Sequence, residues 1–192
     1  MFKTPLDFSI AYHNIEGIHD PNFGCKIPSI STKLIHDVEI LAETWGDCEH
    51  DHNIAGYQLV QIKPQKFTCA SKGRSSGGLN IYYKTCLHKF IKKSKNTPHY
   101  MWLEFDKAIF YDFDYPLRLC VCYNPPSSSK YCNKEIYEEI SSNVIKHSSR
   151  KYPTLIIGDL NSRTGNLPDY IDYDKTELPV GRELIPSKRD DK

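Results

Sequence analysis

The alternation of apolar and polar positions along the chain predicts a series of short strands separated by turns. Strands are expected at Phe8–Tyr12, Asp37–Glu43, Gly56–Lys63, Gly77–Lys84, Tyr100–Phe105, Leu117–Tyr123 and Thr154–Ile157. The last of these is almost wholly apolar and is predicted to be buried. Two helices are expected, one over Ile27–His36 and one from Lys130 to about Ser148, with Ser128 or Ser129 as the N-cap of the second.

Three of these strands end in polar side chains. Asn14 and Glu16 follow the first, Glu43 ends the second, and Asp159 and Asn161 follow the last. In extended backbone, residues two apart point to the same face, so Asp159 and Asn161 can converge on one ligand. A carboxylate beside an amide suits a hydrated metal ion or a phosphate. The alternative is an ordinary turn, because Gly, Asp and Asn favour turns for conformational reasons.

Length and composition place the chain among globular proteins. It has 192 residues, 39% hydrophobic and 26% charged, which suits one substantial domain and excludes a disordered chain. The net charge is only +1. Local charge is less even, since Lys84–Lys95 holds several cations and no acid. We interpret this basic run as a solvated loop, with a nucleic-acid-facing surface as the alternative.

The cysteines and the apolar runs bear on the compartment. Seven cysteines without a CxxC pair indicate reduced thiols, and Cys120 and Cys122 are expected on the same buried face of one strand. The sequence has no apolar run long enough to cross a bilayer, and Met1–Asp7 lacks the apolar stretch of a signal peptide. We therefore expect an intracellular protein, nuclear or cytoplasmic.

Five segments, in order, resemble the motifs of one superfamily. They are Asn14-Ile15-Glu16-Gly17-Ile18, Leu41-Ala42-Glu43-Thr44-Trp45, Ser76-Gly77-Gly78-Leu79, Tyr123-Asn124-Pro125-Pro126 and Gly158-Asp159-Leu160-Asn161-Ser162-Arg163-Thr164-Gly165. Together they are similar to the endonuclease/exonuclease/phosphatase (DNase I-like) domain in the version carried by non-LTR retrotransposons. The resemblance implies an α/β fold, a DNase I-like four-layer sandwich with two mixed sheets.

The resemblance also implies an activity and roles for residues. The activity is DNA nicking by phosphodiester hydrolysis with Mg²⁺ or Mn²⁺ as cofactor, with DNA as the partner. Glu43 and Glu16 would hold the metal. The expected catalytic residues are Asn14, Tyr123, Asp159 and Asn161, and the expected substrate-binding residues are Arg74, Ser76 and Arg163.

The chain departs from the family pattern after Gly165. We expect residues 1–166 to form the N-terminal portion of the domain and residues 167–192 to form a polar tail. The family's later Asp-His pair, which supplies a positioned general base, has no counterpart, since no histidine follows Asn166. We therefore expect an incomplete second sheet, weak or absent hydrolysis, and marginal stability or self-association. Two alternatives stay open: a non-catalytic remnant that binds nucleic acid or protein, and a phosphatase or sphingomyelinase branch of the superfamily.

Overall fold

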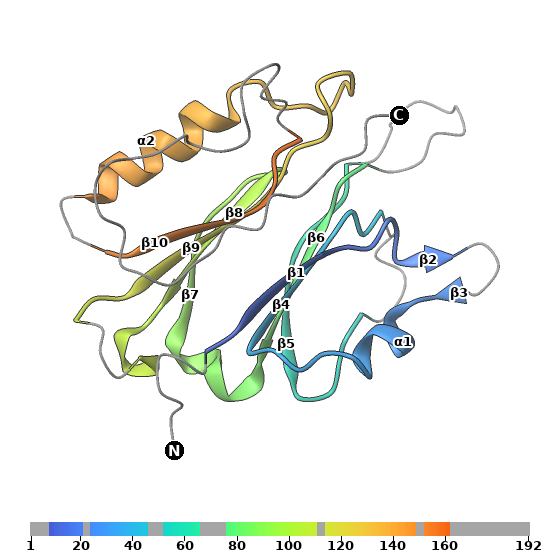
Figure 1. Ribbon diagram of the computed structural model, residues 1–192, viewed down its shortest axis with the longest axis horizontal. Coiled ribbons are helices and arrows are strands. Elements are labelled where there is room, and N and C mark those ends of the chain that lie inside the picture. The colour runs from blue at the N-terminus through green and yellow to red at the C-terminus, as the bar shows by residue number, and fades with distance from the viewer. Residues whose placement is uncertain are drawn as a thin grey trace, which may run out of the picture. The chain divides into compact units, whose positions relative to one another are not determined.

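Two four-stranded sheets organise the computed structural model, which describes residues 8–20, 24–45, 52–65, 76–110, 114–148 and 152–161 (Figure 1). The first sheet has the order β1 (Ile10–Asn14), β4 (Val38–Ala42), β6 (Leu79–Lys84), β5 (Tyr57–Ile62). The second has the order β10 (Thr154–Asp159), β9 (Leu117–Tyr123), β8 (Tyr100–Phe105), β7 (Ile91–Asn96). The remaining elements are β2 (His19–Asp20), β3 (Gly24–Cys25), α1 (Ile27–Ser31), α2 (Ile136–Ser148) and the 3₁₀ turns η2 (Thr85–Phe90) and η3 (Lys107–Ile109).

The two sheets share one pairing pattern. In each, an outer strand runs parallel to its neighbour, β1 beside β4 and β10 beside β9, and the other two pairings are antiparallel. Both sheets are therefore mixed, which confirms the predicted DNase I-like α/β fold class. The carboxyl ends of a parallel pair lie at the same edge of their sheet. Asn14 thus ends beside Ala42, and Asp159 beside Tyr123.

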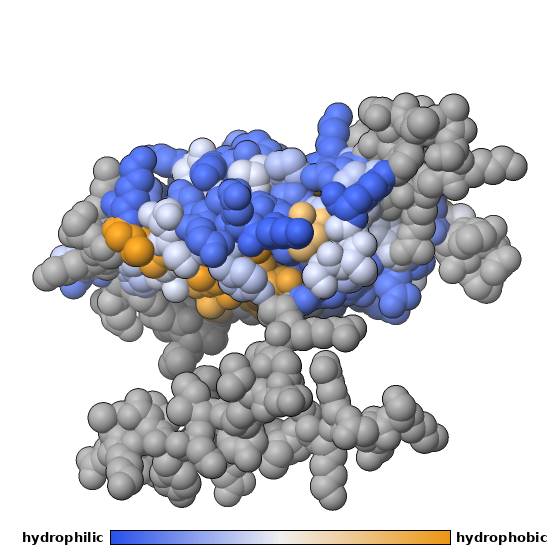
Figure 2. Space-filling model, turned by 90° about the horizontal axis from the view of Figure 1, so that it is seen from above, coloured by the Kyte–Doolittle hydropathy of each residue, from blue (hydrophilic) through white to orange (hydrophobic). Residues whose placement is uncertain are grey.

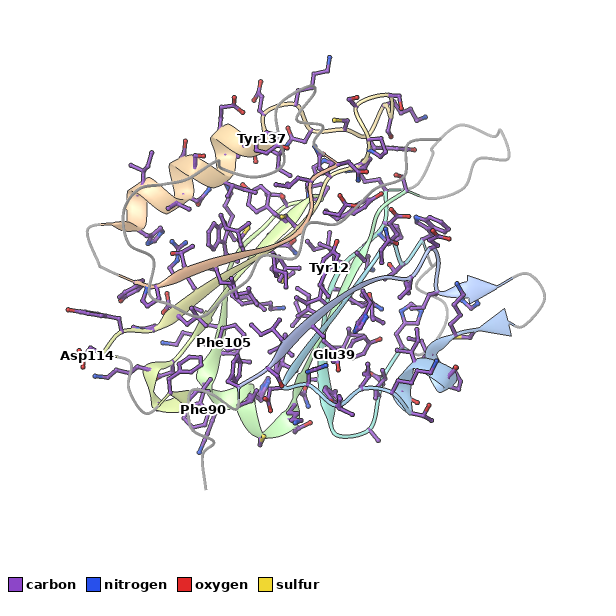
Figure 3. The ribbon with its side chains drawn as sticks, viewed as in Figure 1. Tyr12, Glu39, Phe90, Phe105, Asp114 and Tyr137 are labelled. Atoms are coloured by element: carbon purple, nitrogen blue, oxygen red, sulfur yellow. The ribbon has the colours of Figure 1, made fainter. Side chains whose placement is uncertain are left out.

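The main hydrophobic core lies between the two sheets. Alternate residues of β4 and of β9 face it, for example Ile40 and Val121, and both are fully buried. Phe105 also points into this space, where its ring meets the edge of Phe8 at a centroid distance of 5.6 Å (Figure 3). Burying one such side chain contributes about 1.5–3 kcal/mol. This core fixes the two sheets face to face.

Smaller clusters cover the outer faces. Helix α2 packs Ile136 and Ile140 on Trp102, Cys120 and Cys122 of the second sheet. The shared buried face predicted for the two cysteines is confirmed, and the five cysteines in the described residues are unbridged. Seen from the α2 side, most atoms are hydrophilic, and apolar atoms gather along one margin (Figure 2). The outer face of the first sheet is covered by a cluster that includes residues of α1 and the segments beside it.

The prediction of a buried last strand is wrong. β10 forms over Thr154–Asp159, but Leu155 and Ile156 are 41% and 45% exposed. The reason is position: among the described residues β10 pairs only with β9, so it is an edge strand. Only Ile157 packs against the core between the sheets. An apolar run alone does not distinguish a central strand from an edge strand.

Both predicted helices form, but each is shorter than expected. α1 ends at Ser31, where the hydroxyls of Ser31 and Thr32 donate to the carbonyls of Pro28 and Ser29 and compete with further helical turns. α2 begins only at Ile136. Neither predicted serine caps it.

The segment before α2 explains its late start. The Ser129 hydroxyl oxygen accepts from the amide of Tyr131 at 3.2 Å, within a turn after Pro126. It is Asn133 whose side chain accepts from Glu135, next to the helix. The segment before Ile136, which the periodicity predicted as helix, therefore forms turns after the prolines instead.

The basic run is not a loop. Lys84–Lys95 ends β6, forms η2 and enters β7, which the sequence did not reveal because Ile91–Asn96 has no apolar alternation. Lys92, Lys93 and Lys95 are exposed on this strand. Charged side chains on an outer strand oppose unwanted strand pairing.

Every described residue belongs to one compact unit, Met1–Ser162. The predicted polar tail at residues 167–192 lies outside the described residues. No helix within the described ranges is long and apolar enough to span a membrane.

Candidate active site

Glu43 is the meeting point of the two sheets. It directly follows β4, and its Oε1 accepts a hydrogen bond from Asn14 Nδ2 at 2.8 Å, at the end of β1. The same oxygen accepts from the Tyr123 hydroxyl at 2.8 Å, at the end of β9 in the other sheet. The side chains of Asn14 and Tyr123, at the ends of two strands, therefore both bond to the carboxylate of Glu43, which follows a third strand. The parallel pairing of β1 with β4 brings Asn14 and Glu43 to one edge.

Backbone strain concentrates at this place. Four non-glycine residues in the described part of the chain have positive φ: Glu16 (48°), Glu43 (54°), Trp45 (44°) and Asn161 (46°). L-residues enter this region rarely, at a cost of about 1–3 kcal/mol each, and such strain clusters at functional sites. Three of the four are residues predicted to act in the site. Their side chains are thus held in place by a fold that overcomes the local preference.

The loop after β1 is held against the loop after β4. Gly17 N donates to the carbonyl of Glu43 at 2.7 Å, and a Cβ on Gly17 would lie 2.6 Å from the Trp45 ring. The amide of Glu16 donates to Asn14 Oδ1 at 3.2 Å. The backbone of Glu16 is therefore fixed beside Asn14, while its side chain is exposed.

Asp159 and Asn161 form a second linked pair. Asp159 Oδ1 accepts from the amide of Asn161 at 2.8 Å, and Asn161 Nδ2 donates to the carbonyl of Asn124 at 2.8 Å. The Asp159 amide donates to the Tyr12 hydroxyl oxygen at 3.1 Å, across the gap between the sheets. Asp159 and Asn161 are therefore linked through the Asn161 backbone, and the pair is tied to β1. Asn161 has a positive φ and is not extended, so the predicted convergence of the two side chains on one ligand stays a prediction.

Two tyrosines at the site hold their protons. Burial, followed by the hydrogen bond to Glu43 and the nearby Asp159 carboxylate, raises the pKa of Tyr123. Burial also raises the pKa of Tyr12, against the opposing effect of the Asp159 amide. Both hydroxyls therefore stay neutral at physiological pH. The Tyr123 proton is donated to Glu43, so in this arrangement it is engaged with the carboxylate rather than open to a phosphate.

The glycine motif supports the loop that carries Glu43. Thr44 N and Trp45 N donate to the carbonyls of Gly78 and Gly77 at 3.3 and 3.2 Å. Gly78 has φ +90°, and a Cβ there would collide with Thr44 Oγ1. Ser76 is positioned by a backbone bridge to Gln65. The other two predicted substrate-binding residues, Arg74 and Arg163, lie outside the described residues.

The donor set fits a hard divalent cation with few protein ligands. Both hydrogen bonds to Glu43 use Oε1, and no described residue donates to Oε2. Within the described residues no three His, Cys, Asp or Glu side chains gather closely enough to enclose a metal. Mg²⁺ commonly binds through one or two carboxylates and keeps several waters, so it does not require such a cluster.

Sequence patterns did not point to two polar residues at this edge. The strand pattern gives Tyr12 no role in the site, yet its side chain lies between the sheets (Figure 3), where its hydroxyl oxygen accepts from the Asp159 amide. His99 precedes β8, and its carbonyl accepts from Tyr123 N at 2.8 Å. The alternation of β1 could have placed Tyr12 on the same face as Asn14. Nothing in the sequence indicated the pairing of His99.

Comparison with known proteins finds similarity in structure only. No protein-family model matches the chain, and no curated protein matches it. Among solved structures with a similar fold, AP endonuclease LMAP from Leishmania major is 16% identical, with a TM-score of 0.49 over 83% of this chain. The human Nocturnin catalytic domain with bound sulfate is 12% identical, with a TM-score of 0.47 over 79% of this chain. D. rerio TDP2 complexed with a single-strand DNA product is 13% identical, with a TM-score of 0.44 over 80% of this chain. The chain covers 58%, 62% and 60% of those structures. At such low identity the case for function rests on this chain's own residues.

Proposed function

We propose that this chain is a weak phosphodiester hydrolase that nicks DNA slowly with the help of Mg²⁺ or Mn²⁺, in the manner of a retroelement endonuclease. The observation that carries the proposal is the Glu43 carboxylate, held on strained backbone and shared by Asn14 and Tyr123 from two sheets. This network lies at the carboxyl edge of two parallel strand pairs, and strained backbone of this kind clusters at functional sites.

Each residue of the network suits one task in hydrolysis. Glu43, with Glu16, would hold the cation, since Oε2 of Glu43 remains for a ligand. When bound, the cation supplies positive charge that offsets the charge building on the phosphate oxygens. Asp159 and Asn161 are held on one turn, where the second carboxylate oxygen of Asp159 and the side-chain oxygen of Asn161 would orient a water molecule toward phosphorus.

Tyr123 and Asn14 act on Glu43. Both of their hydrogen bonds fall on Oε1, which holds the carboxylate and leaves Oε2 without a donor among the described residues. A positioned carboxylate loses less freedom when it takes up a cation. We assign both residues the role of positioning Glu43.

DNA as the substrate and the retroelement branch are supported by sequence features. Ser76-Gly77-Gly78-Leu79 and Ser162-Arg163-Thr164-Gly165 resemble the retroelement motifs. Gly77 and Gly78 carry the loop of Glu43, so the first of these motifs supports the site directly.

A second candidate is a non-catalytic nucleic-acid-binding protein. The exposed lysines of β7, Lys92, Lys93 and Lys95, favour it. Such a protein would bind DNA with a steep salt dependence and without any need for metal. The phosphatase or sphingomyelinase branch has no feature of its own in the described residues.

The test is nicking of supercoiled plasmid under single-turnover conditions, with excess protein so that slow hydrolysis is visible. We expect open-circular product with Mg²⁺, none with EDTA, and a loss of at least a hundredfold for Glu43→Gln. Glu138→Gln, on the exposed face of α2, is the matched control and should act as wild type. Nicking that is unchanged in Glu43→Gln would contradict the proposal, as would DNA binding without any hydrolysis.

A further inference from the structure

Lys26 contacts the segment that carries Glu16. β2 and β3 pair antiparallel and turn the chain back on itself, so that Lys26 N donates to the carbonyl of Ile18 at 2.8 Å. The Lys26 side chain extends further, and its Nζ donates to the carbonyl oxygen of Ile15 at 2.9 Å, in a partly buried position. Lys26 therefore bonds to both ends of the segment Ile15–Ile18.

The same segment is also bonded to the loop after β4. Gly17 N donates to the carbonyl of Glu43 at 2.7 Å, and Ile18 N donates to that of Thr44 at 2.8 Å. These bonds join backbone to backbone and do not depend on the side chains. The bond from Lys26 Nζ requires the lysine side chain, so a substitution removes it and leaves the backbone bonds of the segment available.

The Ile15 carbonyl belongs to the peptide group that joins Ile15 to Glu16. Glu16 has φ +48°, a conformation that L-residues adopt rarely. A flip of this peptide group would return Glu16 to negative φ, and would also turn the carbonyl away from Lys26. A hydrogen bond from an ammonium is stronger than one between neutral groups. The bond from Lys26 therefore opposes the flip and stabilises the strained conformation of Glu16.

Helix capping does not account for a lysine at this position. Lys26 is the N-cap of α1, and its side chain makes no cap hydrogen bond. Ser, Thr, Asp and Asn are preferred there because their side chains accept from the first helical amides, which an ammonium cannot do. The side chain is engaged with Ile15 instead. Its chemistry thus serves the Glu16 segment rather than the helix.

We propose that Lys26 is a positioning residue of the metal site. By holding the Ile15 carbonyl, it keeps Glu16 in the conformation from which its carboxylate joins Glu43 at the cation. This inference rests on the proposed function, because it takes Glu16 as a ligand of the cation. A carboxylate that is held before the cation arrives loses less freedom on binding.

The positive charge of Lys26 makes the sign of the effect informative. An ammonium near the site repels Mg²⁺, so its removal, by charge alone, strengthens binding of the cation. Loss of the bond to Ile15 releases Glu16 and weakens binding. We expect positioning to outweigh repulsion, because Lys26 is partly exposed and salt screens its charge. Weaker Mg²⁺ binding in a variant without the ammonium is therefore evidence of positioning.

The test is titration with Mg²⁺ by isothermal titration calorimetry, without DNA and at constant ionic strength. Lys26→Met removes the charge and the donor but keeps an unbranched side chain, and we expect its Kd for Mg²⁺ to rise about fivefold. Lys26→Arg keeps the charge and the donors and should bind within about twofold of wild type. Lys33→Met, at an exposed position beyond α1, loses the same charge and is the matched control, which should bind as wild type.

A double-mutant cycle tests whether Lys26 acts through Glu16. In a Glu16→Gln background, the change Lys26→Met should weaken Mg²⁺ binding no further. A metal-free readout is the amide hydrogen exchange of Gly17, followed by NMR, which should become faster in Lys26→Met and not in Lys26→Arg. The amide of Ile81, in the middle of β6, reports on global unfolding and should exchange at the same rate in all variants.

The inference and the proposed function fail in different ways. Mg²⁺ binding by Lys26→Met that equals or exceeds that of wild type overturns the inference, and so does an equal weakening in the Glu16→Gln background. Both results leave the proposed function in place, since wild type then still binds the cation. If wild type binds neither Mg²⁺ nor Mn²⁺, the metal role of Glu43 falls and the inference falls with it.

Discussion

The hydroxyl oxygen of Tyr12 accepts a hydrogen bond from the backbone amide of Asp159 at 3.1 Å, and so joins the first strand to the last described one across 147 residues of sequence. This bond fixes the position of the Asp159 backbone at the end of β10 relative to β1. Because Tyr12 is also two residues before Asn14 on β1, it sets both sides of the candidate site from one strand.

Tyr12→Phe removes this acceptor and keeps the ring. The Asp159 amide then lacks its partner, so we expect a loss of about 1–2 kcal/mol in the free energy of unfolding. The nicking rate should fall further than this loss of folded protein explains, because Asp159 is no longer held. Urea unfolding and single-turnover nicking measure the two effects. Tyr137→Phe, on the exposed face of α2, is the control and should change neither.

Metal binding can be tested without turnover. A ligand at a hundredfold excess over its Kd stabilises the folded state by about 2.7 kcal/mol. We expect Mg²⁺ to raise the Tm of wild type and of Glu138→Gln, but not that of Glu43→Gln. Equal Mg²⁺ shifts in all three proteins would show that the cation binds elsewhere. Differential scanning fluorimetry over a range of Mg²⁺ concentrations is sufficient.

Gly78→Ala should disturb the loop that carries Glu43. The new Cβ meets Thr44 Oγ1 and sits on a backbone at φ +90°, so both overpacking and strain apply. We expect a loss of about 2–4 kcal/mol, measured by urea unfolding. Gly56→Ala has φ +82° but no atom within 4 Å of its Cβ, so it carries the strain alone. If the two variants lose the same stability, the contact with Thr44 contributes nothing.

Asp37 gives a pH-dependent contribution to stability. Burial alone would raise its pKa, but hydrogen bonds from Lys84 Nζ at 3.0 Å and from Ser9 outweigh burial and lower it. A lowered folded-state pKa means that the stabilisation is present above the unfolded pKa and lost as pH falls through the folded one. Asp37→Asn should therefore cost about 2 kcal/mol at pH 7, with the difference from wild type shrinking in acid.

The measurement for Asp37 is urea unfolding at a series of pH values from 7 downward. Asp114→Asn, at an exposed position, is the control. A difference between Asp37→Asn and wild type that stays constant with pH would show that the carboxylate is not the source of the stability.

The lysines of β7 can be tested for the DNA contact on which the second candidate function relies. If Lys92 and Lys93 each contact a phosphate, the double change to alanine should lower the slope of log K against log salt by about 1.8. Anisotropy at four or more salt concentrations measures the slope. An unchanged slope would leave these lysines the role of protecting an outer strand.

The sequence indicated which polar side chains lie at neighbouring strand ends better than it indicated burial and element boundaries. Asn14, Glu43, Asp159 and Asn161 stood out because polar groups at strand ends follow from the period of two in a strand, and the parallel pairing then brought Asn14 to Glu43. Tyr123 was a candidate because it lies in a motif that resembles the family's. Its bond to Glu43 depends on how the two sheets pack. Such packing is long-range information that no local pattern contains.

Burial and element boundaries were less predictable for definite reasons. The apolar residues of β10 suggested a central strand, yet whether a strand is central depends on its neighbours. β7 has no apolar period at all, and the ladder with β8 forms it. Tertiary pairing thus overrides local preference in both cases. The expected weak activity and self-association stay predictions.

The division of the site between two sheets has a consequence for biosynthesis. Asn14 and Glu43 leave the ribosome early, while Tyr123 and Asp159 follow many residues later. A nascent chain that has folded only its first sheet has Asn14 and Glu43 in place but lacks Tyr123 and Asp159 of the second sheet. The hydrogen bonds that join the two sheets at the candidate site can therefore form only when β9 and β10 have docked on the first sheet.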